Sequence, residues 1–398
     1  MRRRRRSDGR SLHFEDGRYR VLGLDQSLAQ GCNLIGYAFA EFGIGEHLRL
    51  VAQALLDAGL PLAVINQNDT IHRQEERLLS DHVQETNPYK TNIICYNNSL
   101  VSQWYFSGNR LLEGRYNIGY GYWELSEYPD EWLYAMNLLD EIWAPSRFVQ
   151  EVISRKSSLP VVHMPIPVQF RPSRTFRRED FGLPERKLIF LSVFDLTAFH
   201  RKNPGAAINS FRKAFPLGSE PVELVLKTKS NESEADKRNL QELEEMIASD
   251  PRIRLINAYF TKDEVLGLIS VSDCLLSLHR SEGFGLPIAE AMGMGKTVIA
   301  TAYSGNMDFM NRQNSFPIQY ELVDVKPGQY FNLEGTSVWA EPDGEEAAAC
   351  MGEILRDPES FRRAASLAAE EIQMYYNLEV IGGRYRSRLE LIGLIEPF

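Results

Sequence analysis

The chain has 398 residues, 43% of them hydrophobic, which is long enough to bury more than one core and favours two domains. Its net charge of −10 argues against a general nucleic-acid-binding role, because contact with many phosphates requires a surplus of Lys and Arg. No stretch approaches the roughly 18 consecutive apolar residues that span a bilayer, and no apolar secretion signal follows the first residues.

Cysteine usage and the start of the chain indicate where the protein works. The basic run from Arg2 to Arg6 lies in a segment, residues 1–18, that we expect to be solvated and disordered. The alternative is a weak peripheral contact of this run with anionic lipid at the inner membrane face. Four widely spaced cysteines without a C-x-x-C pair indicate a reducing, cytoplasmic compartment, with neither a disulfide framework nor a zinc ribbon: Cys32, Cys95, Cys274 and Cys350.

The first half of the chain alternates strand and helix patterns. From Gly31 an apolar segment meets a glycine turn, then a helical pattern that stops at Gly59, then a new apolar run, which together predict a β-α-β unit. Further apolar runs follow at TNIICYN, RYNIGYGYW, DEIWAPS and PVVHMPIPV. This alternation predicts a mostly parallel sheet covered on both faces, in an N-terminal domain over residues 1–170. Residues 165–186 are rich in Pro and Arg and read as a linker.

A second α/β series occupies residues 186–378. Its predicted strands are KLIFLSVFD, VELVLKT, IRLINAY, CLLSLHR and TVIATAY, with helices between them. The final segment, 379–398, contains a helical pattern around residues 382–395. Its apolar and aromatic residues are spaced to lie across another surface: Tyr385, Leu389, Ile392 and Ile395.

The most informative stretch runs from Leu278 to Met310. It places two carboxylates, Glu282 and Glu290, on either side of seven residues that include a Gly-Phe-Gly turn, and Pro287 predicts a helix start between them. Backbone N–H groups and the positive end of such a helix suit a diphosphate, and glycines let the backbone approach it closely. The carboxylates can accept hydrogen bonds from ribose and sugar hydroxyls. The alternative is a pair of capping charges beside an ordinary turn.

The segment E-GFGLPIA-E resembles the Glu-x7-Glu hallmark of glycosyltransferase family four. Three other segments look like parts of that family: GIGEHLRLVAQALLDAG, DEIWAPSRFV and VFDLTAFHRKNPGAAINSFRKAF. The resemblance implies a GT-B fold, in which two Rossmann-like domains face a central cleft and the final helix crosses back to the N-terminal domain. It also implies that sugar is transferred from a UDP- or GDP-linked donor with retention of the anomeric configuration. The sequence has no D-x-D element and no His/Cys cluster with ligand spacing, so we expect a metal-independent reaction without a cofactor. The acceptor would be a glycan or a lipid-linked molecule, in polysaccharide or glycoconjugate synthesis.

By that resemblance the donor lies mainly against the C-terminal domain. Glu290 would bind the ribose and Glu282 the sugar hydroxyls. Residues 283–286 would contact the sugar and diphosphate through Gly283, Phe284, Gly285 and Leu286. Gly43 and Gly45, at the start of the first long helix, would face the diphosphate. Ser304 follows the predicted strand TVIATAY, and its hydroxyl at that strand end is a candidate to line the donor pocket; the alternative is an ordinary turn.

Positive charge is needed to stabilise a departing diphosphate where no metal does so. Lys202 matches the lysine of the family's basic pair, whereas the family's arginine would fall near Asp195. Lys227 ends a predicted strand, where ligands of open parallel sheets bind. We therefore expect Lys202 and Lys227 to supply the charge, with Arg201 as an alternative.

The sequence departs from the family at one further position. Relatives carry a His after an N-terminal strand, whereas GYGYWELSEYP has none. Trp123 and Glu124 occupy this region and are candidates for contact with acceptor or sugar, as is His279. The departures leave open a non-catalytic nucleotide-sugar binding or scaffold subunit, and a sugar-phosphate phosphorylase or epimerase of similar architecture.

Overall fold

The computed structural model describes residues 11–15, 18–95, 110–231, 233–331 and 336–397. They form two compact units. The first comprises the described residues up to Trp123, Tyr128–Pro167 and those from Tyr375 onward, and the second comprises Glu124–Glu127 and Val168–Met374. The basic run from Arg2 to Arg6 lies outside the described residues.

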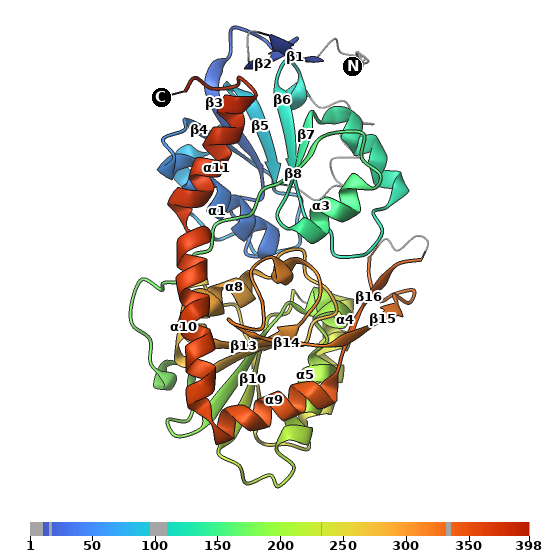
Figure 1. Cartoon of the computed structure of the whole chain (residues 1–398), viewed down its shortest axis with the longest axis vertical. Helices are drawn as coiled ribbons and strands as arrows, with labels where there is room; N and C mark the ends of the chain where they lie inside the picture. Colours follow the sequence, from blue (N-terminus) through green and yellow to red (C-terminus); the bar gives the residue numbers. More distant parts are fainter. Residues whose placement is uncertain (1–10, 16–17, 96–109, 232, 332–335, 398) are drawn as a thin grey trace. The chain divides into compact units, whose positions relative to one another are not determined.

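The first unit is built on a parallel six-stranded sheet with the order β4-β3-β5-β6-β7-β8 (Figure 1). Its strands are β3 (Ala29–Gly36), β4 (Leu62–Asn66), β5 (Tyr89–Cys95), β6 (Tyr116–Tyr120), β7 (Glu141–Ala144) and β8 (Val161–His163). Its α-helices are α1 (Gly43–Asp57), α3 (Arg147–Ser154) and α11 (Leu378–Leu391), with 3-10 turns at Ser80–His82, Arg110–Leu112 and Asp130–Leu138. The predicted β-α-β unit is β3-α1-β4, and each further strand predicted in this half of the chain is present.

Residues 11–15 and residue 18 form strands, so the expectation of disorder over residues 1–18 is wrong at these positions. β1 (Ser11–Glu15) and β2 (Arg18–Leu22) pair as antiparallel strands. The sequence carries the signal for this pairing, because apolar residues alternate on both sides of an Asp-Gly pair, the residue pair preferred in two-residue hairpin turns.

A row of buried amides crosses the first sheet. Asn33, Asn92 and Asn117 are in register on β3, β5 and β6 and are fully buried. The amide of Asn33 donates to Oδ1 of Asn92 at 2.9 Å, and the amide of Asn92 donates to Oδ1 of Asn117 at 2.8 Å. Nδ2 of Asn117 donates to Leu112 O, and Asp140 extends the row by accepting from the Asn117 backbone N–H. Because a register shift would leave these amides unpaired, the row fixes how the strands align.

The final helix packs on the first unit, against α1 (Figure 1). At Gly382 a Cβ would overlap the carbonyl oxygen of Ala54, so only glycine allows this close approach. The Tyr385 hydroxyl donates to Pro165 O at 3.0 Å, and Arg388 forms an ion pair with the buried Glu141. The helix begins at Leu378, earlier than expected, and Ile392 and Ile395 are buried beyond its end.

The second unit holds a second parallel sheet of six strands, with the order β11-β10-β9-β12-β13-β14. Its strands are β9 (Leu188–Val193), β10 (Val222–Thr228), β11 (Ile253–Asn257), β12 (Cys274–Ser277), β13 (Thr297–Thr301) and β14 (Phe316–Ile318). An antiparallel pair follows, β15 (Tyr320–Asp324) and β16 (Val338–Pro342). The helices are α4 (Phe199–Lys202), α5 (Pro204–Ala214), α6 (Glu234–Ile247), α7 (Lys262–Val271), α8 (Leu286–Gly293), α9 (Gly344–Arg356) and α10 (Pro358–Tyr375). Shorter 3-10 turns lie at Arg178–Phe181, Leu196–Ala198 and Gly305–Asp308.

An aromatic and aliphatic core joins α5, α6 and α9 to one face of this sheet. Phe190 on β9 packs against Phe211 and Phe215 at the end of α5. Leu243 from α6 and Met351 from α9 are fully buried in the same cluster. This packing supports the strands, and the loops at their ends carry the polar groups.

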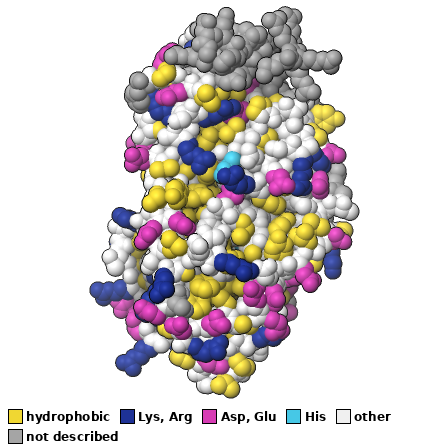
Figure 2. Space-filling view, in the orientation of Figure 1, with side chains coloured by type: hydrophobic (Ala, Val, Ile, Leu, Met, Phe, Trp, Pro, Cys, Tyr) yellow, Lys and Arg dark blue, Asp and Glu magenta, His cyan; other side chains and the backbone are white. Residues whose placement is uncertain are grey.

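The surface and helices add two observations. On the face drawn in Figure 2, acidic and basic side chains are interspersed among the described residues rather than gathered into one basic stripe.

Among helices in the described part of the chain, none is both long and apolar enough to cross a membrane.

Candidate functional site

The topology of the second sheet selects one place for a ligand. From β9 the chain first adds β10 and β11 on one side and then β12, β13 and β14 on the other. The loops that follow β9 and β12 therefore diverge, and open parallel sheets bind ligands at the carboxyl ends of strands where this occurs. The candidate site is built from these two loops and the loop after β13.

Arg201 and Lys202 come from the loop after β9 and meet Glu282 from the loop after β12. Lys202 Nζ forms an ion pair with Oε1 of Glu282, and Arg201 Nη1 donates to Oε2 of the same carboxylate at 3.2 Å. The same Nη1 donates to Ser281 O at 2.8 Å. Burial alone would raise the pKa of Glu282, but Lys202 and Arg201 outweigh it and lower the pKa to about 2. The carboxylate is therefore ionised at neutral pH, and Arg201 and Lys202 both contact it.

Arg280 fixes the position of the two cations. Its backbone N–H donates to Arg201 O at 2.7 Å, and its Nη1 donates to His200 O at 2.7 Å. Its Nε donates to Glu341 on β16 at 2.6 Å, and Nδ2 of Asn203 donates to the other oxygen of Glu341. Arg280 thus connects α4 to β16.

Glu124 lies in the second unit, although the sequence placed it in the N-terminal domain. Its Oε1 is 3.7 Å from Arg201 Nη2, and its Oε2 accepts a hydrogen bond from the Tyr330 hydroxyl. A second hydrogen bond fixes the segment Glu124–Glu127: the backbone N–H of Val338 donates to Ser126 Oγ. Tyr330 was not predicted, because it stands between β15 and β16 without a recognisable motif.

The glycine loop and the loop after β13 support one another. The backbone N–H of Glu282 donates to Ser304 Oγ at 2.7 Å, and the N–H of Gly305 donates to Glu282 O at 2.9 Å. A Cβ at Gly305 would overlap Gly283 O, so the close approach of the two loops requires glycine. Ser304 adopts a φ of 73°, which is strained for a residue with a side chain and is found where surrounding contacts enforce it.

The predicted helix start is confirmed as α8, which begins at Leu286 with Pro287 in its first turn. Gly285 caps it in the left-handed region with a φ of 91°. Phe284 is 2% exposed and packs against Phe309, so its side chain anchors the loop and leaves the backbone to line the site. Leu286 is half-buried at the first position of α8.

Glu290 is buried in α8 and forms an ion pair with Lys262, the first residue of α7. Thr261 and Glu264 form a capping box that fixes the start of α7 and hence the position of Lys262. The sequence T-K-D-E carries the signal for that helix start, but the partner of Glu290 could not be read from it.

His279 is fully buried beneath the loops. Burial lowers the pKa of its imidazole, so the ring is neutral at physiological pH. Nδ2 of Asn306 donates to Thr301 O, so its Oδ1 faces His279 and accepts from Nε2, at 3.1 Å. Nδ1 then accepts from the hydroxyl of Ser277 at 3.0 Å. The ring connects the loops after β12 and β13, and its nitrogens are engaged within the protein.

Lys227 ends β10 in a setting unlike that of Lys202. Its Nζ donates to Thr228 O at 2.9 Å and to Ala258 O at 2.7 Å, and it lies 4.4 Å from the centre of the Phe260 ring. Burial and the charge of Lys229 lower the pKa of Lys227 to about 8. The ammonium group thereby links β10 to the segment after β11.

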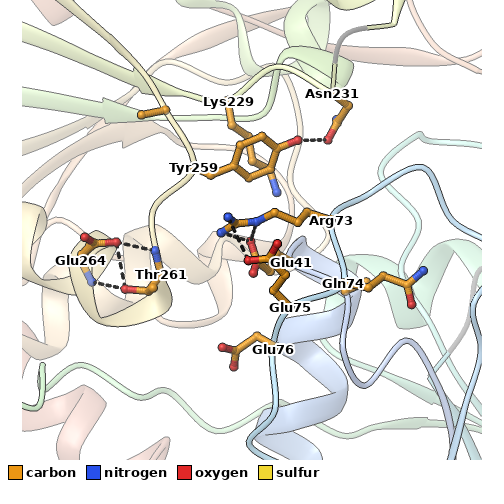
Figure 3. Close-up of polar contacts among 12 residues, drawn as sticks. Glu41, Arg73, Gln74, Glu75, Glu76, Lys229, Asn231, Tyr259, Thr261 and Glu264 are labelled. Atoms are coloured by element: carbon orange, nitrogen blue, oxygen red, sulfur yellow. Dashed lines mark hydrogen bonds and ion pairs between the residues drawn. The ribbon is translucent and has the colours of Figure 1, made fainter.

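Beside Lys227, Lys229 Nζ lies 5.6 Å from the centre of the Tyr259 ring. The hydroxyl of Tyr259 donates to Asn231 at 2.9 Å (Figure 3). A second basic position therefore stands at the end of β10.

The start of α1 in the first unit holds Gly43 and Gly45. A Cβ at Gly45 would overlap Ala40 O, whereas a Cβ at Gly43 would meet nothing within 4 Å. The loop before α1 is held by Arg49, which donates to Ala38 O and Ala40 O at 3.1 and 2.9 Å. It is also held by the ion pair between Arg73 and Glu41, drawn in Figure 3.

Trp123 is 2% exposed in the first unit. Its ring packs edge-on against Tyr128 and Trp132 at 5.8 and 5.0 Å between ring centres. The indole therefore belongs to an aromatic core, and Glu124, the next residue, is the one that reaches the charged cluster.

One protein-family model matches part of the chain. Residues 196–324 match the family model described as Glycosyl transferases group 1, and this segment contains Arg201, Lys202, Lys227, Glu282, Glu290 and Ser304. No curated protein sequence gives a significant match to the chain.

Solved structures are similar over nearly the whole chain. Anabaena Alr3699/HepE in complex with UDP-glucose has a TM-score of 0.68 and 15% identity, covering 90% of this chain and 99% of that one. Sucrose-phosphate synthase from Thermosynechococcus elongatus has a TM-score of 0.67 and 15% identity, covering 91% and 99%. A glycosyltransferase from Rickettsia africae ESF-5 has a TM-score of 0.65 and 14% identity, covering 91% and 98%. The predicted α/β architecture is confirmed: the chain has the GT-B fold of these structures, and its segment 196–324 is similar to Glycosyl transferases group 1.

Proposed function

We propose that this protein is a glycosyltransferase of family four that moves a sugar from a UDP- or GDP-linked donor onto an acceptor hydroxyl. The family match over residues 196–324 supports this assignment, because it covers the loops described above. A structure of the same fold has UDP-glucose bound, which supports a nucleotide sugar as the donor class. The acceptor we propose is a glycan or a lipid-linked molecule, in polysaccharide or glycoconjugate synthesis.

One observation carries the proposal: two cations with unused donors stand beside a buried carboxylate at the entrance of a glycine loop. In the described residues, Arg201 makes its hydrogen bonds only through Nη1, so Nε and Nη2 remain available. Lys202 Nζ is hydrogen-bonded only to Glu282 there, which leaves two of its three protons. Donors held beside a fixed carboxylate match a ligand that carries phosphates next to hydroxyl groups.

The chemistry follows from that arrangement. As the sugar leaves, negative charge grows on the diphosphate, and positioned cations stabilise it without reorganising. Glu282, with a pKa near 2, stays ionised and can accept hydrogen bonds from sugar hydroxyls. We assign Glu290 to the ribose, Lys227 to a supporting charge at the end of β10, and Gly43 with Gly45 to the diphosphate.

We further propose that transfer retains the anomeric configuration and needs no metal ion. The resemblance to family four suggests retention, with the leaving diphosphate as the base that takes the acceptor proton. Arg201 and Lys202 supply the positive charge that a metal ion supplies in other transferases. Activity should therefore survive EDTA.

A nucleotide screen followed by turnover tests the proposal. UDP, GDP and their glucose and mannose conjugates are added in a thermal-shift assay, and the strongest binder should raise the Tm. Its sugar conjugate is then incubated with acceptor extracts, and release of free nucleoside diphosphate is measured. Lys202→Ala should lose turnover, whereas Lys213→Ala, which removes an exposed lysine of the same unit, should not.

Two results would contradict the proposal. If no nucleotide shifts the Tm, the donor site is wrong. If a nucleotide sugar binds but is neither hydrolysed nor transferred with any extract, the protein is the non-catalytic binding subunit.

A further inference from the structure

Arg201 is bracketed by two carboxylates at unequal distances. Glu282 accepts a hydrogen bond from Nη1 at 3.2 Å, whereas Glu124 comes no closer to Nη2 than 3.7 Å. The second distance lies beyond the usual range for an N–H···O hydrogen bond, so Glu124 provides charge without occupying the donor. Both side chains of this pair are largely buried, with 13% and 19% exposed, so the charge is only weakly screened.

Tyr330 accounts for the distance. Its hydroxyl donates to Oε2 of Glu124, while Oε1 faces Arg201. The Tyr330 ring stacks on Phe331 at 4.8 Å between ring centres, which limits its movement. Burial, with Glu124 beside it, raises the pKa of the Tyr330 phenol well above its usual range, so the hydroxyl stays protonated and keeps donating.

We propose that Glu124 is a restrained counter-ion and Tyr330 the residue that restrains it, so that Arg201 stays oriented while its Nη2 remains open to the donor diphosphate. Both are positioning residues that act through Arg201, and the inference rests on the proposed function. Two carboxylates, Glu124 and Glu282, balance two cations, Arg201 and Lys202, before the donor binds. A diphosphate must then compete with Glu124 for Arg201, and Tyr330 weakens that competitor by holding it back.

The inference predicts opposite effects for two nearly isosteric substitutions. Glu124→Gln removes the competing charge, so the Kd of the nucleoside diphosphate should fall roughly threefold to tenfold. Tyr330→Phe releases the carboxylate to close onto Arg201, so the Kd should rise by about the same factor. In the double variant Tyr330→Phe should add nothing, because the group it restrains is gone.

The experiment is calorimetric titration of each variant with UDP or GDP, whichever binds the wild-type protein. Glu124→Asp shortens the side chain but keeps its charge, and its Kd should fall between those of the wild type and Glu124→Gln. Matched controls are Glu321→Gln and Tyr320→Phe, two exposed positions on β15, which should leave the Kd unchanged. The Tm of each variant without ligand shows whether it is folded.

The outcomes separate this inference from the proposed function. If Lys202→Ala weakens binding but Glu124→Gln and Tyr330→Phe both weaken it or both leave it unchanged, the restrained counter-ion is wrong and the donor site stands. If neither UDP nor GDP binds the wild-type protein, the donor site and the counter-ion fall together. Opposite shifts that vanish in the double variant would establish the inference, because a purely structural role weakens binding in both variants.

Discussion

The two parallel sheets of this protein carry polar networks that differ in position and in how fully their donors are used. In the first sheet, neutral amides run in register across β3, β5 and β6, and each donates to another amide or to a backbone carbonyl. In the second sheet, charged groups gather beyond the carboxyl ends of β9 and β12, where Arg201 and Lys202 keep donors that no described group uses. A satisfied network specifies structure, whereas one with unused donors is suited to binding a ligand.

The largest effect should come from breaking the charged cluster. Lys202→Ala removes one of two cations placed to stabilise the leaving diphosphate, so kcat should fall by about 10²- to 10³-fold, the cost of losing one positioned donor. The free energy of unfolding should change little, because Arg201 still neutralises Glu282. Steady-state turnover and urea unfolding of the same preparations measure the two quantities. If Lys202→Ala lowered the free energy of unfolding without lowering turnover, the charged cluster would have a structural role rather than a role in binding a ligand.

Breaking the amide row should have the opposite pattern. Asn92→Leu keeps the approximate size of the side chain but leaves Asn33 and Asn117 without their amide partners inside the sheet. We expect a loss of about 2 to 4 kcal/mol in the free energy of unfolding, the range for several unsatisfied buried groups. Urea denaturation measures it, and Asn257→Leu, at an exposed position on β11 of the other sheet, is the matched control. Turnover per folded molecule should be unchanged.

Sequence patterns predicted the two sheets because parallel strands buried on both faces are nearly continuous apolar runs. The β1–β2 pairing was missed, although an Asp-Gly pair between alternating residues favours it. The observed units divide at Pro167 and again at Met374, and the second also takes Glu124–Glu127. Composition gives no signal that these four residues belong to the second unit. Their place is set by hydrogen bonds to Tyr330 and Val338, which lie far along the chain.

The candidate site could be predicted only where local geometry dictates it. Pro287 and the flanking glycines indicate the start of α8 on their own, since helix initiation is local. The pairing of Glu282 with Lys202 and of Glu290 with Lys262 depends on which strands are neighbours, and sheet order is not written in any single segment. The assignments of Glu290 to the ribose, of Glu282 to the sugar, and of Gly43 with Gly45 to the diphosphate stay predictions.

Lys227 tests whether every charged group at the carboxyl ends of the second sheet serves a ligand. It lies at the end of β10, but its Nζ donates to two backbone carbonyls of the protein. Its pKa is about 8 when folded and 10.5 when unfolded, so between these values the unfolded chain binds more protons. Stability contributed by this residue should therefore rise from pH 8 to pH 10.5, by about 1 to 3 kcal/mol. Urea unfolding across that window should show the rise in wild type, and Lys227→Met should remove it.

The same variant tests the supporting charge assigned to Lys227 in transfer. Because its Nζ donates to Thr228 O and Ala258 O, we expect kcat to fall by only about tenfold in Lys227→Met. Lys213→Met, at an exposed position, is the control for both measurements. An effect on kcat as large as that of Lys202→Ala would move Lys227 into contact with the donor.

The smallest effect is expected where the carboxyl ends of the first sheet are closed by a neutral pair. The Tyr385 hydroxyl donates to Pro165 O at 3.0 Å and lies 3.1 Å from the hydroxyl of Tyr120, at the end of β6. Tyr120 in turn donates to Met164 O at 2.6 Å, so its own proton stays bound when Tyr385 is changed. Tyr385→Phe keeps the ring, which stacks on Trp143, and should cost about 1 kcal/mol in unfolding free energy. A loss of several kcal/mol would mean that this hydroxyl, rather than the ion pair of Arg388 with Glu141, holds α11 in place. Unfolding of Arg388→Met, measured under the same conditions, decides between the two.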